Sequence, residues 1–352
     1  MSKHISKIEL DDLAKIIPKL SPDRHKGQNG KIAVIGGSLD YTGAPNYAGS
    51  TALRGGCDLI HIFCTESAGV PIKSYSPELI VHNSLPSTES FKESEFDDKK
   101  KEGSLKKVTA WFDSMHSFII GPGLGRDAIV SKCLPDILNS IKDECTVLFD
   151  GDMLWHLSDS PTSSQIKEAL KKIATRTVLT PNKVEFGRLW KAFMPQENQT
   201  SNEEKEKARE ELKNAEGTIL EVDLDNVFVS DAVKLSKVLY NVTIFQKGGF
   251  DIATDGKKAY VVKEQGALKR SGGQGDILSG LMGVYIYWNS VYWEKEKKSD
   301  TESRILKGCV LASVVAKKAG KLTFEKHKYS LTTPAIIERV SDVIDGFYQA
   351  SD

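Results

Sequence analysis

The chain has 352 residues, with 48 basic and 48 acidic side chains and a formal net charge of zero. This balance provides no global field that would draw the protein to nucleic acid or to a membrane surface. No apolar run reaches the roughly 18 residues of a membrane-spanning helix, and residues 1–20 resemble neither a signal peptide nor an organellar presequence. The five cysteines form no CxxC pair and are expected to be reduced. The sequence therefore predicts a cytoplasmic protein without nucleic-acid or membrane partners.

Short apolar, β-branched runs alternate with helical patterns through much of the chain. The expected strands are Lys31–Gly36, Asp58–Cys64, Ser117–Gly121, Thr146–Asp150, Thr177–Thr180 and Val242–Gln246, with helices between them such as Asn46–Gly56, Ile129–Ile141 and Ser230–Tyr240. Continuous apolar character is typical of parallel strands that are buried on both faces. The alternation predicts an α/β fold with a mostly parallel central sheet and right-handed crossovers.

The later part of the chain departs from this alternation. Phe250–Thr254 and Ala259–Lys263 flank an Asp-Gly turn and predict a β-hairpin at an antiparallel edge of the sheet. Asp276–Tyr287 and Arg304–Lys318 follow as apolar helical runs, and Thr333-Pro334 is expected to begin the last helix.

Three segments near 86–107, 196–211 and 294–304 consist mainly of charged and polar residues. Such composition is typical of solvated surface insertions, and we assign no chemistry to them. Because no internal repeat or domain linker is evident, residues 1–352 are expected to form a single domain.

The strongest functional pattern is Ser271-Gly272-Gly273-Gln274-Gly275-Asp276, directly before the helical run. Glycines let the backbone approach an anion, and the free N–H groups of a helix start then hold negative charge, as a phosphate requires. Asp276 could simply cap the helix. A phosphate would repel a carboxylate beside it, however, so a neutral serine would be the better cap there. The pattern therefore favours a catalytic Asp276.

Two further patterns follow expected strands. Thr180-Pro181-Asn182 ends one strand, and Asn182 and Glu185 lie on one face of the next helix, where they could form a capping box or order water around Mg²⁺. Gln246–Asp251 contains Lys247, which could pair with a phosphate, although a simple strand-to-hairpin turn explains its glycines equally well.

The run from Gly121 to Asp127 is a glycine-rich loop after the strand Ser117–Gly121. It is only a weak dinucleotide-fold signal, because Ala128 replaces the third glycine and the run lies in the middle of the chain. We therefore interpret it as a ligand loop. His156, next to Trp155, is expected to pack in the core rather than to act in catalysis.

Taken in order, these patterns resemble the ribokinase-like ATP- or ADP-dependent NAD(P)H-hydrate dehydratases, in particular the eukaryotic ATP-dependent type. The resemblance runs from about Lys26 to Gly346. It includes KIAVIGGS at 31, YTGAPNYAGSTALRGGCDL at 41, SPELIVH at 76, IIGPGLGRD at 119, LTPNKVEF at 179 and SGGQGDILSG at 271. Where the family often has an Asp-Ala-Asp run, this chain has Asp150 and Asp152 on either side of Gly151. The resemblance implies a ribokinase-like three-layer α/β/α fold.

The resemblance also implies site residues. ATP would be held by Lys247, Gly248, Gly249, Phe250, Asp251, Gly266, Ala267, Leu268, Lys269, Arg270, Ser271, Gly272, Gly273, Gln274 and Gly275. The hydrated dinucleotide would contact Gly123, Asn182, Lys183, Val184, Glu185, Phe186, Gly187, Arg188 and Asp276. Asp276 would be the catalytic residue, and Glu185 would contact Mg²⁺ through water.

The implied reaction is ATP-dependent dehydration of the S epimer of hydrated NADH or NADPH, with ATP as co-substrate and Mg²⁺ as cofactor. The resemblance is also compatible with a homo-oligomer and with functional pairing to an NAD(P)H-hydrate epimerase. Two alternatives remain from the residues themselves. One is a small-molecule kinase that phosphorylates a pyrimidine, thiazole or sugar hydroxyl, and the other is a non-catalytic nucleotide-binding protein.

Overall fold

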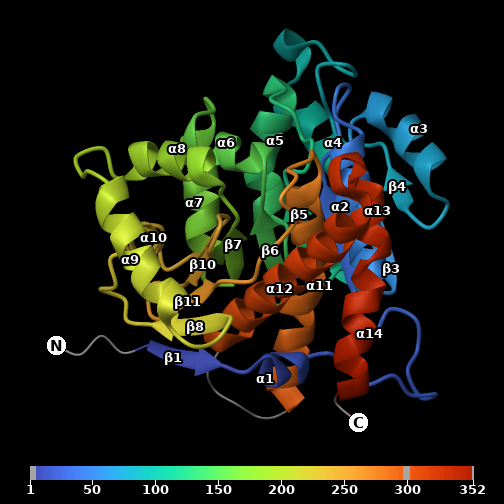
Figure 1. Cartoon of the computed structure of the whole chain (residues 1–352). Helices are drawn as coiled ribbons and strands as arrows, with labels where there is room; N and C mark the ends of the chain where they lie inside the picture. The colour runs from blue at the N-terminus through green and yellow to red at the C-terminus, as the bar shows by residue number, and fades with distance from the viewer. Residues whose placement is uncertain (1–4, 296–301, 351–352) are drawn as a thin grey trace.

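The computed structural model describes residues 5–295 and 302–350. An 11-stranded sheet crosses the whole molecule in the order β1-β8-β11-β10-β9-β7-β6-β5-β2-β3-β4 (Figure 1). The strands are β1 (Ile5–Ile8), β2 (Lys31–Ile35), β3 (Leu59–Phe63), β4 (Ile80–His82), β5 (Ser117–Ile120), β6 (Thr146–Phe149), β7 (Thr177–Leu179), β8 (Ile219–Val222), β9 (Thr243–Gln246), β10 (Asp251–Thr254) and β11 (Ala259–Val262). The seven strands from β9 to β4 pair in parallel, and the remaining pairs are antiparallel.

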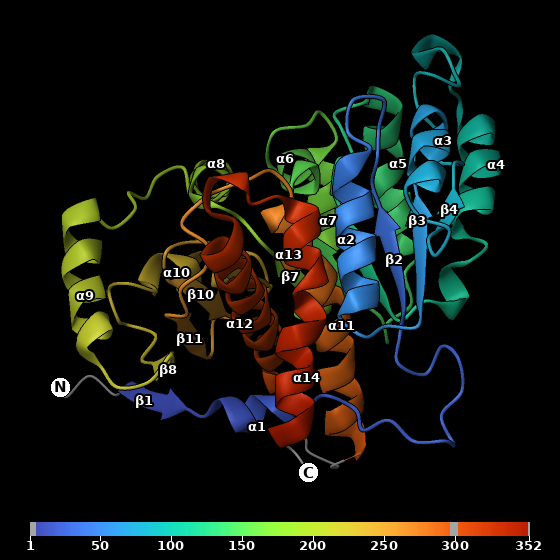
Figure 2. The ribbon, with the colours of Figure 1, turned by 45° about the vertical axis from the view of Figure 1, so that its right-hand side comes forward.

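Helices cover both faces of the sheet, so the architecture has three layers (Figure 2). One layer contains α1 (Leu10–Ala14), α2 (Gly43–Arg54), α3 (Glu66–Tyr75), α11 (Gln274–Lys295), α12 (Glu302–His327), α13 (Thr333–Glu338) and α14 (Val340–Ala350). The other contains α4 (Asp98–Thr109), α5 (Ala128–Asn139), α6 (Asp152–Ser158), α7 (Ser163–Ile173), α8 (Lys183–Phe193), α9 (Asn202–Asn214) and α10 (Ser230–Val238). This confirms the expected α/β/α fold with a mostly parallel sheet and an antiparallel edge. The β10–β11 hairpin lies within that antiparallel part, with β8 and β1 outside it.

The alternation of side chains along the strands divides the core in two. In β2, Ile32 and Val34 point into the core under α2, α11 and α12, whereas Ala33 and Ile35 point into the core under α5 and α7. Successive side chains of a strand face opposite sides, so a strand covered on both faces must be apolar at every position. This is why the sequence of each central strand is a continuous apolar run.

The most buried helix is α11, which carries the Asp276 pattern at its start. Its contact with α2 depends on Gly280, where an added Cβ would lie 2.3 Å from the carbonyl oxygen of Ala48. The close approach of these two helices holds α11 against α2 one helical turn after Asp276. The position of Asp276 is therefore fixed by packing along a 22-residue helix.

Several details differ from the expectations. The pattern Thr333-Pro334 does begin a helix, with Pro in its first turn, but α14 follows it, so α13 is not the last helix. The short strands β1, β4 and β8 were not expected, because they lack long apolar runs. No helix in the described ranges is long and apolar enough to cross a bilayer.

The charged segments contain more order than their composition suggests. Segment 86–107 includes most of α4, whose Val108 is fully buried, and segment 196–211 includes most of α9. The N–H and hydroxyl of Thr88 both donate to Asp127 Oδ2 at 2.9 and 2.5 Å, while Asp127 Oδ1 caps α5. In the third segment, 294–304, residues 296–301 lie outside the described residues.

Candidate active site

The loops that follow β2, β5 and β6 touch at the carboxyl edge of the parallel sheet, where ligands bind in open α/β folds. At Gly121, whose φ is +123°, an added Cβ would lie 1.8 Å from the carbonyl oxygen of Asp150. At Gly36 it would lie 2.1 Å from the carbonyl oxygen of Pro122. The glycine pattern at 121 therefore brings three loop backbones into contact and places Asp150 beside the later motifs.

Asp150 and Lys247 form a buried ion pair at the centre of this edge. Lys247 Nζ donates to Asp150 Oδ1 at 2.7 Å, and the same oxygen accepts the Thr180 hydroxyl at 2.8 Å. The other oxygen, Oδ2, accepts the Ser279 hydroxyl of α11 at 2.6 Å. Burial alone would raise the pKa of Asp150, but Lys247 and the two hydroxyls outweigh it and hold that pKa below its ordinary value. The network joins β6, β7, β9 and α11.

Asp276 lies in the first turn of α11, beside this ion pair, and is not the residue that caps the helix. Within residues 5–295 and 302–350, no hydrogen bond or ion pair reaches its carboxylate. Burial raises the pKa of Asp276 to about 8; the negative charge of Asp150 adds to this effect and Lys247 opposes it. A carboxylate without a partner, next to residues that line a pocket and with a pKa near neutrality, suits a general base.

Asn182 and Glu185 form the capping box that their spacing allows. The Asn182 side chain accepts the N–H groups of Val184 and Glu185, and Glu185 Oε2 accepts the N–H of Asn182 at 2.8 Å. Glu185 Oε2 also lies 3.9 Å from Lys247 Nζ, and burial raises the pKa of Glu185 despite that charge. Glu185 thus caps α8 and also faces the central ion pair.

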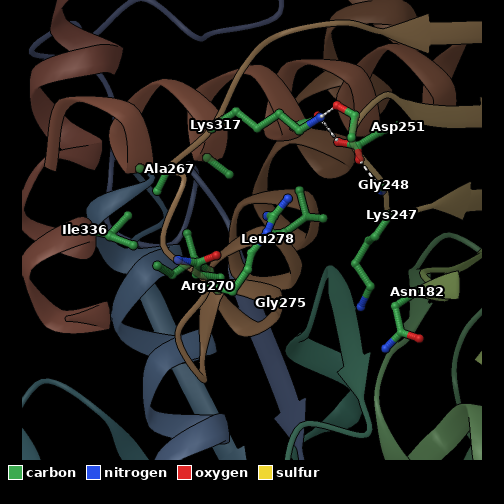
Figure 3. Close-up of a pocket in the computed structure, with 17 residues that line it drawn as sticks. Asn182, Lys247, Gly248, Asp251, Ala267, Arg270, Gly275, Leu278, Lys317 and Ile336 are labelled. Carbon is green, nitrogen blue, oxygen red and sulfur yellow. Dashed lines mark hydrogen bonds and ion pairs between the residues drawn. The ribbon is translucent and has the colours of Figure 1, made fainter. Parts of the chain in front are cut away.

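A pocket of about 330 Å³ opens beside these groups (Figure 3). Many of the expected ATP residues line it: Lys247, Gly248, Gly249, Asp251, Gly266, Ala267, Arg270, Gln274 and Gly275. Its other walls come from Asn182, Ile277, Leu278, Ser313, Ala316, Lys317, Gly320 and Ile336. One side is therefore apolar and the other carries glycine backbone and lysines, as a nucleobase and a phosphate chain require.

The remaining expected ATP residues lie outside the lining of this pocket. The side chain of Leu268 is 81% exposed, and Lys269 Nζ donates to the carbonyls of Tyr329 and Leu331. Ser271, Gly272 and Gly273 contact Thr333, whose hydroxyl donates to the Gly272 carbonyl. Phe250 packs edge-on against Phe228. These residues shape the loops around the pocket.

Most of the expected dinucleotide contacts also lie outside the lining of this pocket, which includes only Asn182 among them. Gly123, with φ of +60°, packs on the backbone of Tyr41, and Val184 is 72% exposed. Phe186 is only 1% exposed in the core, so its side chain does not reach the cleft. Arg188 Nε lies 3.4 Å from Asp159 Oδ2. Lys183 and Gly187 belong to the first turns of α8.

His156 packs in the core, as expected, where Nε2 lies 2.8 Å from the carbonyl oxygen of Gly125.

The sequence did not reveal what α9, α12 and α13 contribute. Ser313 and Lys317 lie in a run that looks like an ordinary core helix, and Ile336 lies in the short helix after Thr333-Pro334. Arg209 of α9 lies beside Gly249, although its segment was expected to be only solvated surface. No local pattern identifies these residues, because their positions depend on how distant segments pack.

The fold is the ribokinase-like three-layer fold. A ribokinase-like superfamily protein from Enterococcus faecalis has this fold, with a TM-score of 0.66 at 15% identity over 97% of this chain and 96% of that one. The same fold is found in an ADP/ATP-dependent NAD(P)H-hydrate dehydratase from Bacillus subtilis co-crystallised with ATP and Mg²⁺, with a TM-score of 0.59 at 18% identity over 96% of this chain and 97% of that one.

Sequence comparison is more specific. The family model for NAD(P)H-hydrate dehydratase matches residues 32–238 and 229–342. The ATP-dependent (S)-NAD(P)H-hydrate dehydratase of Physcomitrium patens is 37% identical over 96% of this chain and 95% of its own length. The enzyme of the same name from Rattus norvegicus is 36% identical over 92% of this chain and 81% of its own length. The chain belongs to the NAD(P)H-hydrate dehydratase family.

Proposed function

We propose that the protein is an ATP-dependent dehydratase that returns the S epimer of hydrated NADH or NADPH to the intact dinucleotide, releasing ADP and phosphate. This makes it a carbon–oxygen lyase. The observation that carries the proposal is Asp276, an unpaired carboxylate in the described structure with its pKa raised to about 8, at the helix start beside a nucleotide-sized pocket. The names of the similar enzymes from moss and rat support the same reaction.

The chemical difficulty is that hydroxide is a poor leaving group. Asp276 takes the proton of the ring hydroxyl while that oxygen attacks the γ-phosphorus of ATP, and the bond from phosphorus to the β-γ bridging oxygen breaks to release ADP. Phosphate then leaves the ring carbon with the electron pair of the C–O bond, pushed by the lone pair of the ring nitrogen. Loss of a proton from the neighbouring carbon restores the double bond. The phosphoryl group thus serves only to make the oxygen leave.

The protein stabilises the transferring charge mainly with its backbone. The first internal bond of α11 runs from the N–H of Ile277 to the carbonyl of Gly273. The N–H groups of Gln274, Gly275 and Asp276 therefore have no partner within the helix and are free to bind phosphate oxygens. Lys247 adds a positive charge next to these N–H groups, since its Nζ would lie 3.6 Å from a Cβ added at Gly275.

The residues present suit Mg²⁺ only if the nucleotide supplies most of its ligands. No group of three or more acidic, histidine or cysteine side chains in the described ranges could hold a metal. Both oxygens of Asp150 are already bonded, whereas Glu185 Oε2 accepts a single backbone N–H. Mg²⁺ typically binds through phosphates and one or two carboxylates, and would there neutralise phosphate charge. Glu185 is the residue that we propose to hold it, through water.

A small-molecule kinase is the second function that this fold supports, but the family match does not favour it. The two differ in the fate of the phosphate, which a kinase would leave on its product. The test is to incubate the protein with (S)-NADH hydrate and MgATP and to follow the recovery of NADH absorbance together with phosphate. One phosphate per NADH is expected. A stable phosphorylated nucleotide, without NADH, would contradict the proposal.

Because the reaction takes one epimer, we also propose that the protein works alongside an epimerase activity that interconverts the two hydrates.

A further inference from the structure

The turn Gly248–Asp251 connects β9 to β10, with Asp251 as the first residue of β10, and forms one wall of the pocket. Its conformation is set by Asp251, which is 3% exposed and whose Oδ1 accepts the N–H of Gly248 at 2.7 Å. This bond curls the turn back on itself, so that the backbone of Gly248 and Gly249 faces the pocket. The residues that hold the Asp251 carboxylate therefore also determine the conformation of this wall of the pocket.

Helix α12 provides that support from about 60 positions further along the chain. The Ser313 hydroxyl donates to Asp251 Oδ2 at 2.7 Å, and Lys317 Nζ lies 2.9 Å from the same oxygen. Lys317 Nζ also donates to the carbonyl of Gly249 at 3.4 Å. Figure 3 shows Lys317 extended from α12 across the top of the pocket toward Asp251. Lys317 thus contacts two oxygens of the turn, the side-chain Oδ2 of Asp251 and the backbone carbonyl of Gly249.

Helix α9 contributes a second cation. The Arg209 guanidinium lies over the ring of Phe250, with its central carbon 4.9 Å from the ring centroid. It also occupies the space beside Gly249, where an added Cβ would lie 2.7 Å from one of its terminal nitrogens. Arg209 is therefore packed against the turn, although it comes from the charged segment 196–211.

We propose that Lys317 and Arg209 are positioning residues that hold the Gly248–Asp251 turn in the conformation that binds the phosphates of ATP. This rests on the proposed use of ATP at this pocket. Neither residue would take part in the chemical step, which occurs at Asp276.

The test uses full-length variants and isothermal titration with MgATP, which needs no turnover. Lys317→Met and Arg209→Leu should each weaken ATP binding by about tenfold or more, as expected for loss of a charged hydrogen bond or a stacked cation. Lys321→Met and Lys207→Leu are matched controls, because these lysines lie on the exposed faces of the same two helices, and they should bind ATP normally. Lys317→Arg should recover much of the affinity.

Steady-state kinetics separates positioning from general stability. The KM for ATP should rise in both variants, while kcat at saturating ATP and the KM for the hydrated dinucleotide remain within about twofold of wild type. Variants that bind MgATP like wild type would overturn the inference, and so would an unchanged KM with a lower kcat. A wild type that binds MgATP but recovers no NADH would contradict only the proposed dehydration. A wild type that binds no MgATP would overturn both.

Discussion

The Lys247 ammonium lies 2.7 Å from the Asp150 carboxylate, although 97 positions separate the two residues along the chain. The pair is nearly enclosed, with side-chain exposures of 20% and 5%. It places a positive charge beside Asp276 and a second negative charge behind it. The site therefore holds a charged pair beside a carboxyl group whose pKa is raised to about 8, and each of the three residues can be changed separately.

Breaking this pair should be costly. Lys247→Met leaves Asp150 buried without its cation, which commonly costs about 3–5 kcal/mol of unfolding free energy. The double variant Lys247→Met with Asp150→Asn should recover part of that loss. Urea denaturation measures both. As a control, Lys132→Met removes a half-exposed pair with Glu93 and should cost less than about 1 kcal/mol. Equal losses of unfolding free energy in Lys247→Met and Lys132→Met would show that the buried pair stabilises the fold no more than an exposed pair does.

Asp276→Asn should lower kcat by about 10²–10⁴-fold, because the amide cannot accept the proton of the ring hydroxyl. ATP binding should change little, since the pocket lining consists of other residues. The measurement combines NADH recovery with calorimetry of MgATP binding. A variant that kept more than about a third of the wild-type rate would remove Asp276 from the mechanism.

The raised pKa of Asp276, about 8, predicts the pH dependence of the reaction. The base must be ionised, so kcat/KM should rise with pH and level off above about 8. Stability should follow the opposite trend. Between the ordinary value of 3.8 and about 8 the folded protein keeps a proton that the unfolded chain releases, so wild type loses stability as pH rises.

Asp276→Asn has no such titration, so its melting temperature should exceed that of wild type by a margin that grows across this pH range. A difference in melting temperature between the two proteins that stayed constant across this pH range would show that the Asp276 carboxyl titrates normally.

Two of the three glycines before Asp276, Gly273 and Gly275, should behave differently. Gly273 has φ of +92°, and an added Cβ would lie 2.7 Å from both Thr333 and Tyr47, so Gly273→Ala should cost about 1–3 kcal/mol. At Gly275 the nearest atom to an added Cβ is Lys247 Nζ at 3.6 Å, so Gly275→Val should keep the fold but occupy the phosphate site. Melting curves with and without MgATP test this. If MgATP raised the melting temperature of Gly275→Val as much as that of wild type, the loop would be a structural turn and not a phosphate site.

The charged segment 86–107 should matter for stability. Its deletion removes most of α4 and the two bonds from Thr88 to Asp127, and so should lower the melting temperature even if the site survives. Replacing only exposed charges, such as Lys99 and Glu102, should leave it unchanged. An unchanged melting temperature after the deletion would mean that α4 packs too loosely to contribute.

Sequence patterns were most informative where one local requirement dominates. The central strands were predictable because burial on both faces demands continuous apolar residues. The position of Asp276 at a helix start was predictable because it follows three glycines and precedes an apolar helical run. The sequence pointed to Lys247 as a phosphate ligand, but not to Asp150 as its partner in the folded chain. That pairing, like the approach of Arg209 and Lys317 to one turn, depends on side-chain packing between distant segments, which no local period encodes.

The contact between Thr333 and Gly272 has a consequence for protein synthesis. The Thr333 hydroxyl donates to the carbonyl of Gly272, and Ile336 completes the apolar side of the pocket. A growing chain therefore contains Lys247 and Asp276 before it contains the residues that complete the pocket. A chain truncated before residue 333 would lack this hydrogen bond and the Ile336 side chain, so it should bind ATP more weakly than the full chain.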